Sequence, residues 1–149
     1  GWPGSRLGTR PVARGWARRA SEAAITHASG ARREHLVSSL SDLPTTRAYL
    51  AKAWADLAAH EALLKETAAR VETPDDGTVL AVLTTKAACN EAALRITDSA
   101  MRVAGGAGFS NHLAIERYAR DARAGFVMAP TSDALFDFAG RALCGMDLF

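Results

Sequence analysis

Residues 102–131, RVAGGAGFSNHLAIERYARDARAGFVMAPT, decide how this chain folds. The apolar periodicity that precedes them stops at Gly105 and Gly106, and Gly108 follows. Glycine is favoured just past the C-terminus of a helix because it adopts a positive φ without steric cost. The stretch is therefore predicted to hold a helix end, a glycine turn, a second helix rich in charge, and a break at Pro130, which disfavours helical backbone at the residue before it.

The segments on either side of this stretch have the period of amphipathic helices. Residues 78–104 are apolar on two faces, which is typical of a helix in the middle of a bundle. Thr131 is expected to cap a last helix over residues 132–143. Further helices are expected over residues 12–31, from about 44 to 72, and over 113–127. The sequence predicts an all-α, antiparallel up-and-down bundle over residues 12–149, without strands and with a loose lead-in at 1–11.

Two of these helices have predicted core-facing stripes of apolar residues at steps of three and four. The residues expected to face the core from the first two helices are Val12, Trp16, Ala20, Ala23, His27, Ala31, Leu50, Trp54, Leu57, Leu64, Ala68 and Val71.

The composition excludes several classes of protein. The chain has 149 residues, of which 48% are hydrophobic and 23% charged, as expected for one ordinary helical domain. The arginine-rich N-terminal segment has no aromatic interleaving, so nucleic-acid binding is not predicted. No apolar run is long enough to span a membrane, and the scattered histidines predict no metal site. Cys89 and Cys144 are far apart in sequence and are expected to be thiols in a reducing, cytoplasmic environment.

The order of motifs after the glycine turn resembles that of a known family. Residues 116–123, ERYARDAR, follow the turn, and Thr131, Ser132 and Asp133 open the last helix. Together with the glycines, these features resemble the C-terminal helical domain of the acyl-CoA dehydrogenase family of flavoproteins. The resemblance covers about residues 12–149. It implies FAD as cofactor, bound between this domain, two further domains that this sequence does not contain, and a neighbouring subunit, and hence a homo-oligomer.

The resemblance implies contacts to the adenosine diphosphate part of FAD. Arg33 matches an arginine at the end of the family's first helix, which meets the FAD diphosphate of the adjacent subunit. Gly105 and Gly106 match a glycine pair beside the adenosine. Arg102 stands where the family has a glutamine three residues before that pair.

The last helix carries two more implied contacts. Thr131 and Asp133 match positions that reach FAD from a helix N-terminus, where anionic groups are favoured. This interpretation requires that the glycine turn, the charged pairs behind it and the helix capped by Thr131 border one groove for a flavin nucleotide.

The family's catalytic residue is missing from its expected place. Dehydrogenases of the family carry a glutamate in the break before the last helix, where it removes the α-proton of the substrate. Here that position is Ala129, which cannot accept a proton, so no catalytic residue is assigned. Three explanations stay open: Glu22 on the first helix as the base, a flavin-dependent monooxygenase that needs no such base, or a non-catalytic or truncated subunit.

The function that the resemblance implies belongs to a larger enzyme. That enzyme would carry out α,β-dehydrogenation of acyl-CoA thioesters, as in fatty acid metabolism, and pass electrons to an electron-transfer flavoprotein. The isolated chain would be inactive and would need a sister or catalytic subunit. The alternatives are a monooxygenase of the same fold and a helical interaction module that binds no cofactor.

Overall fold

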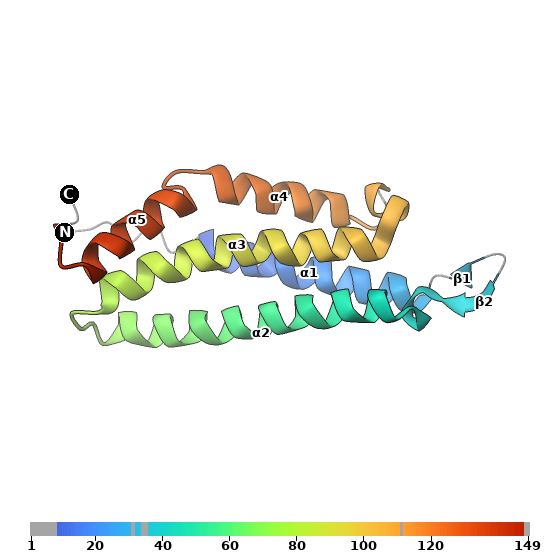
Figure 1. Cartoon of the computed structure of the whole chain (residues 1–149), viewed down its shortest axis with the longest axis horizontal. Coiled ribbons are helices and arrows are strands. Elements are labelled where there is room, and N and C mark those ends of the chain that lie inside the picture. Colours follow the sequence, from blue (N-terminus) through green and yellow to red (C-terminus); the bar gives the residue numbers. More distant parts are fainter. Residues whose placement is uncertain (1–8, 31, 34–35, 111, 148–149) are drawn as a thin grey trace.

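The computed structural model describes residues 9–30, 32–33, 36–110 and 112–147, which form an elongated helical bundle (Figure 1). The helices are α1 (Thr9–Gly30), α2 (Pro44–Glu72), α3 (Thr78–Ala104), α4 (Ile115–Val127) and α5 (Ser132–Leu143). There are also two short 3-10 helices in the described residues. The first, η2 (Leu40–Asp42), follows β2 (Leu36–Ser39), and the second, η3 (Gly105–Phe109), follows α3. The predicted all-α bundle is confirmed.

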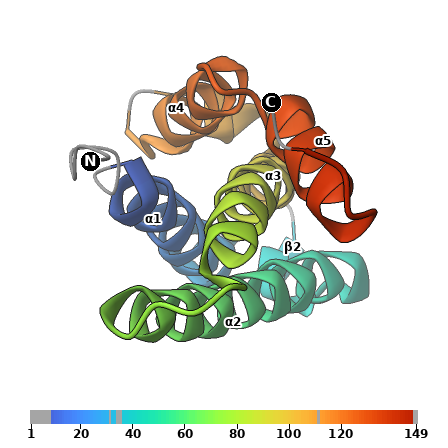
Figure 2. The same cartoon turned by 90° about the vertical axis from the view of Figure 1, so that its left-hand side faces the viewer.

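The third long helix, α3, lies at the centre of the bundle. It contacts α1, α2, α4 and α5, and Figure 2 shows these four helices arranged around it. A helix surrounded in this way must be apolar on more than one face. The two apolar faces predicted for residues 78–104 therefore match the position of α3.

The core is built mainly from alanine, which lets the helices approach closely. One cluster joins α2, α3 and α4, and its buried members are Ala53, Leu57, Ala92, Ala93, Ile96 and Ala122. A second cluster joins α1, α3 and the start of α4, and its buried members are Ala20, Ala24, Ala28, Ala100, Val103, Ala104 and Ile115.

The start of the bundle differs from the prediction in two ways. The first helix begins at Thr9, before the expected start at Val12. It ends at Gly30, and a hairpin follows, in which β1 (Arg32–Arg33) pairs antiparallel with β2. The expectation of a chain without strands was wrong here, because pairing between two such short strands leaves no alternation long enough to recognise.

The predicted core faces of the first two helices are correct in part: Ala20 and Leu57 are buried, and Ala23 and Leu50 pack against the core. Ala24 and Ala28 are buried in α1, whereas Ala23 and His27 are only half-buried. In α2, Trp54 is 58% exposed and Ala53 is buried beside it. A shift of one residue along a helix changes which side chain meets the neighbouring helix. The side chains of Val12, Trp16 and Ala31 lie outside the described part of the chain.

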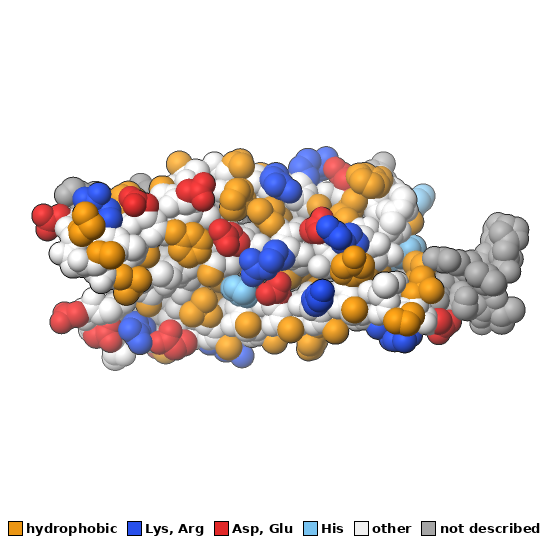
Figure 3. All heavy atoms as spheres, viewed as in Figure 1, with side chains coloured by type: hydrophobic (Ala, Val, Ile, Leu, Met, Phe, Trp, Pro, Cys, Tyr) orange, Lys and Arg blue, Asp and Glu red, His pale blue; other side chains and the backbone are white. Residues whose placement is uncertain are grey.

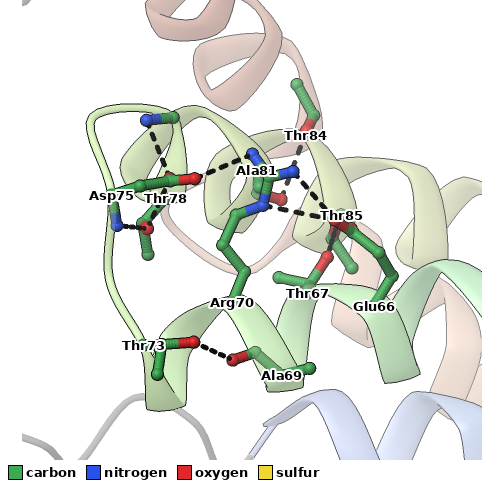
Figure 4. Close-up of polar contacts among 11 residues, drawn as sticks. Glu66, Thr67, Ala69, Arg70, Thr73, Asp75, Thr78, Ala81, Thr84 and Thr85 are labelled. Atoms are coloured by element: carbon green, nitrogen blue, oxygen red, sulfur yellow. Dashed lines mark hydrogen bonds and ion pairs between the residues drawn. The ribbon is translucent and has the colours of Figure 1, made fainter.

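The turn between α2 and α3 explains why α3 begins at Thr78. The Asp75 backbone N–H donates to Thr78 Oγ1 at 2.8 Å, and Thr78 Oγ1 donates to Asp75 Oδ1 at 3.0 Å. The Gly77 backbone N–H also donates to Asp75 Oδ1, at 3.0 Å. Figure 4 shows this turn, with Arg70 reaching from α2 toward it.

Candidate functional site

Arg102, in the last turn of α3, is held by two side chains. Its Nε donates to Asp98 Oδ2 at 2.8 Å, and its Nη1 donates to the hydroxyl of Tyr49, on α2, at 3.4 Å. The guanidinium carbon lies 5.6 Å from the centre of the Tyr49 ring, within range of a cation–π contact. The hydrogen bond with Tyr49, followed by that with Asp98, raises the pKa of Arg102 above its usual value. The guanidinium is therefore fixed in place and charged.

Arg102 still has hydrogen-bonding capacity toward a ligand. The side chain is 57% exposed. An arginine has five N–H donors, and the contacts to Asp98 and Tyr49 occupy only two of them within the described part of the chain. The outer edge of the guanidinium can thus donate to an anionic or polar group in solution.

The glycine turn beside Arg102 presents bare backbone. Gly105 has a φ of 58°, in the region that favours glycine, and its N–H donates to the Met101 carbonyl. Gly105 and Gly106 are both exposed, and a Cβ added at either position would have no heavy atom within 4 Å. The open backbone next to a charged guanidinium fits the close approach of a nucleotide.

The third glycine has a different role, which sequence reasoning missed. Gly108 is buried, and a Cβ there would lie 3.1 Å from Ala104 Cβ and 3.2 Å from Met101 Sδ. Glycine at this position lets η3 fold back closely onto the end of α3.

Thr131 caps α5, as predicted. Its Oγ1 accepts a hydrogen bond from the Ala134 backbone N–H at 3.4 Å. Asp133 is exposed in the first turn of the helix. Because Asp133 already places a negative charge at the helix N-terminus, this end suits a neutral polar group of a ligand better than a phosphate.

The structure separates the two groups of predicted residues. Arg102, Gly105 and Gly106 lie where α3 ends, whereas Thr131 and Asp133 lie beyond the far end of α4 (Figure 1). The 13 residues of α4 make it about 20 Å long at 1.5 Å per residue. The glycine turn and the N-terminus of α5 are therefore separated by the length of α4, and a flavin nucleotide that contacts both would have to span it.

Arg33 was predicted to lie at the end of the first helix, but it lies in β1. The helix stops at Gly30, and the backbone of Arg33 pairs with that of Leu36 in the hairpin. The side chain of Arg33 lies outside the described part of the chain. The prediction placed Arg33 on a helix because no local signal marks so short a strand.

The segment before α5 has Ala129 at the position where the resemblance led us to expect a catalytic glutamate. Ala129 is exposed and lies in the irregular segment between α4 and α5. The alternative base, Glu22, is exposed on α1 one turn from Arg18. The pKa of Arg18 is raised, first by its hydrogen bond and charge interaction with Glu61 and to a lesser degree by Glu22. Glu22 thus interacts with a cation on its own helix.

A polar groove that sequence reasoning missed lies at the start of α4. It has a volume of about 180 Å³, and Ser110, Glu116, Arg117 and Arg120 are among the residues that line it. Arg120 Nη1 donates to Glu116 Oε1, one turn earlier on α4, at 3.0 Å. The remaining charge in the groove comes from Arg117.

A more apolar hollow of about 380 Å³ lies at the opposite end of the bundle, near the turn of Figure 4. Leu63, Leu80, Ala81 and Leu143 contribute to its wall. At its rim, Arg70 pairs with Glu66 at 3.0 Å, so both charges are already neutralised locally. Of the predicted site residues whose side chains the structure describes, none is among the residues that line this hollow.

The surface seen in Figure 3 carries acidic and basic side chains side by side, with apolar side chains between them. Across the described residues, no three histidine, cysteine, aspartate or glutamate side chains are grouped so as to hold a metal ion. In the same part of the chain, no helix has both the length and the hydrophobicity that crossing a membrane requires.

Comparison with known proteins identifies one family. A family model described as the C-terminal domain of acyl-CoA dehydrogenase matches residues 3–144. The comparison with curated proteins gives no match.

Several solved structures share the fold. The glutaryl-coenzyme A dehydrogenase glutaryl-CoA complex is 22% identical, with a TM-score of 0.86 over 97% of this chain and 36% of that chain. An FAD-dependent dehydrogenase is 19% identical, with a TM-score of 0.82 over 93% of this chain and 36% of that one. The electron transferring flavoprotein of Acidaminococcus fermentans is 23% identical, with a TM-score of 0.85 over 94% of this chain and 36% of that chain. This chain thus spans little more than a third of each of these proteins.

Proposed function

Because this chain belongs to the acyl-CoA dehydrogenase family, as a C-terminal domain, we propose that it contacts FAD and joins subunits within a larger flavoenzyme. The observation that carries the proposal is the end of α3, where the exposed backbone of Gly105 and Gly106 adjoins the charged guanidinium of Arg102. One of the structures with this fold is an FAD-dependent dehydrogenase.

The two separated groups of residues would contact different parts of the cofactor. Arg102, Gly105 and Gly106 would hold the adenosine portion, with the guanidinium donating hydrogen bonds and the glycines allowing close approach. Thr131 and Asp133 would contact a neutral polar portion, because Asp133 disfavours phosphate at the start of α5. Arg33 would meet the diphosphate of an FAD on the adjacent subunit.

The reaction proposed for the full enzyme is α,β-dehydrogenation of an acyl-CoA thioester. FAD supplies the hydride acceptor in such chemistry, and an electron-transfer flavoprotein would take up the electrons. The residues of this chain would bind and orient the cofactor, and the proton-accepting group would come from elsewhere, because Ala129 carries no titratable group. We also place the protein in the cytoplasm, as its two cysteines led us to expect.

Ala129 favours a second candidate function, a flavin-dependent monooxygenase of the same fold. Such an enzyme uses reduced flavin and oxygen and does not need a carboxylate at this position. An acyl-CoA assay with an artificial electron acceptor, run beside an oxygen-consumption assay with reduced flavin, separates the two activities in the assembled enzyme.

The test of the proposal is retention of flavin by the assembled protein. The chain is mixed with FAD, alone and with its sister or catalytic subunit, and then passed over a size-exclusion column with absorbance and light-scattering detection. A yellow complex with a mass above that of the single chain is expected. If flavin and protein separate in every mixture, the chain is a helical interaction module that binds no cofactor.

A further inference from the structure

A small cavity lies where α1, α2 and α3 meet. Residues that carry hydroxyl groups line it from all three helices: Ser21, Tyr49 and Ser99. Its volume is about 10 Å³, which is the lower limit for one water molecule. Ile25 and Trp54 also line the cavity and are 38% and 58% exposed, so the cavity lies close to the surface of the bundle.

The Ser21 side chain places a hydroxyl oxygen in this region, and that oxygen has no hydrogen-bond partner among the described residues. The residue is 4% exposed, and its Oγ is buried. Other hydroxyls on these helices behave differently. Ser29, Thr84 and Thr97 donate to carbonyls one turn earlier on their own helices, at 2.9, 2.8 and 2.7 Å. A buried hydroxyl that lacks such a bond costs free energy unless something else supplies one.

We propose that this cavity is a binding site for one water molecule, which hydrogen-bonds Ser21 Oγ and bridges it to a hydroxyl of Ser99 or Tyr49. A cavity lined only by apolar groups stays dry, whereas a buried water needs two to four polar partners. Here the three lining residues with hydroxyl groups come from three different helices, so one water held by two of their hydroxyls would satisfy Ser21 and link helices at the same time.

The position of the water also bears on Arg102. Tyr49 lines the cavity and accepts a hydrogen bond from Arg102 Nη1 at 3.4 Å. Its hydroxyl still has its own hydrogen to donate. A water that accepts a hydrogen bond from the Tyr49 hydroxyl would therefore help to hold the Tyr49 ring in its contact with the Arg102 guanidinium. This inference stands without the proposed function, because it concerns only contacts within the bundle.

The direct test is a crystal structure of the chain at a resolution that shows ordered water. Electron density is expected within hydrogen-bond distance of Ser21 Oγ and of a second hydroxyl in the cavity. The same density should be lost in Ser21→Ala, whose methyl group cannot hold the water. A wild-type cavity without density would overturn the proposal.

Thermal unfolding supplies an independent test with a built-in control. Ser21→Ala should lower the midpoint temperature, because the water loses an anchor and the remaining hydroxyls lose a partner. Ser132 is the matched control, since its Oγ is also buried without a partner among the described residues and it does not line this cavity. Ser132→Ala should leave the midpoint unchanged or raise it. A Ser21→Ala variant that behaves like Ser132→Ala contradicts the bound water.

A double-mutant cycle tests whether the water is shared. If one water bridges Ser21 and Ser99, the combined change in Ser21→Ala/Ser99→Ala should be smaller than the sum of the single changes. Additive shifts in the midpoint temperature would show that Ser99 takes no part in the bridge.

Discussion

Arg102 differs in chemistry from the glutamine expected at its position. A glutamine amide is neutral, whereas the guanidinium is charged and is fixed by Asp98 and Tyr49. A fixed cation loses less conformational entropy on binding an anionic nucleotide than a mobile one does. The arginine is therefore compatible with the proposed flavin contact, which would be charge-assisted where the glutamine of the family would make a neutral one.

Arg102→Ala should weaken FAD binding to the assembled protein by roughly 10- to 100-fold, the range expected for a lost hydrogen bond to a charged group. A fluorescence titration of FAD measures the change. Arg95→Ala is the control, because Arg95 also lies on α3 and donates to an aspartate, Asp56, at 3.1 and 3.3 Å. Equal losses in the two variants would mean that Arg102 acts only as a surface ion pair.

Gly105→Ala should lower the free energy of unfolding by about 1–3 kcal/mol, because alanine is strained at the φ of 58° and ψ of −141° found there. Denaturant unfolding followed by circular dichroism measures the loss. Gly106→Ala should change stability little, since that position has open space for a Cβ and no such φ. A loss in Gly106→Ala as large as that in Gly105→Ala would refute the backbone explanation.

At the scale of elements, a buried pair of hydroxyls fixes α2 against α3. Thr67 and Thr85 are both fully buried, and their Oγ1 atoms lie 2.6 Å apart (Figure 4). Thr67→Val leaves the hydroxyl of Thr85 without this partner and should cost about 1–3 kcal/mol. Thr67→Val/Thr85→Val removes both hydroxyls and should cost less than the sum of the single variants. Urea unfolding of all four proteins gives the cycle, and additive losses would argue against the pairing.

The accuracy of the sequence predictions depended on how local the signals were. The bounds of α3 were predicted correctly because residues 73–77 form a turn with its own side-chain bonds and Gly105 supplies the stop. The hairpin at Arg33 was missed because strand pairing involves residues that no periodicity connects. Asp98 lies four residues before Arg102 and its spacing could have been noticed, whereas Tyr49 is far away in sequence and its contact depends on how α2 packs.

At the scale of the whole molecule, stability should depend on the central helix. Ile96 on α3 is 1% exposed and packs in the cluster that joins α2, α3 and α4. Ile96→Ala should lower the free energy of unfolding by about 2–5 kcal/mol through lost burial and a new cavity. Val79→Ala, on the same helix but 57% exposed, is the control and should lose far less. Comparable losses would mean that α3 is not the centre of the cooperative unit.

The separation of the two candidate contact regions also belongs to this scale. The glycine turn and Thr131 lie at opposite ends of α4, whose 13 residues make it about 20 Å long. Their relation across α4 could not be predicted without knowing that this helix lies along α3.

The alanine-built interior has an evolutionary consequence. In most proteins the damaging core changes are truncations, yet a side chain that is already a single methyl has almost nothing left to remove. Enlargement is the hazardous direction here: a valine or leucine at Ala28, Ala93 or Ala104 would force neighbouring helices apart. Related proteins with this bundle should therefore have only glycine, alanine or serine at these sites, whereas substitutions to larger side chains should be confined to the solvent-facing sides of the helices.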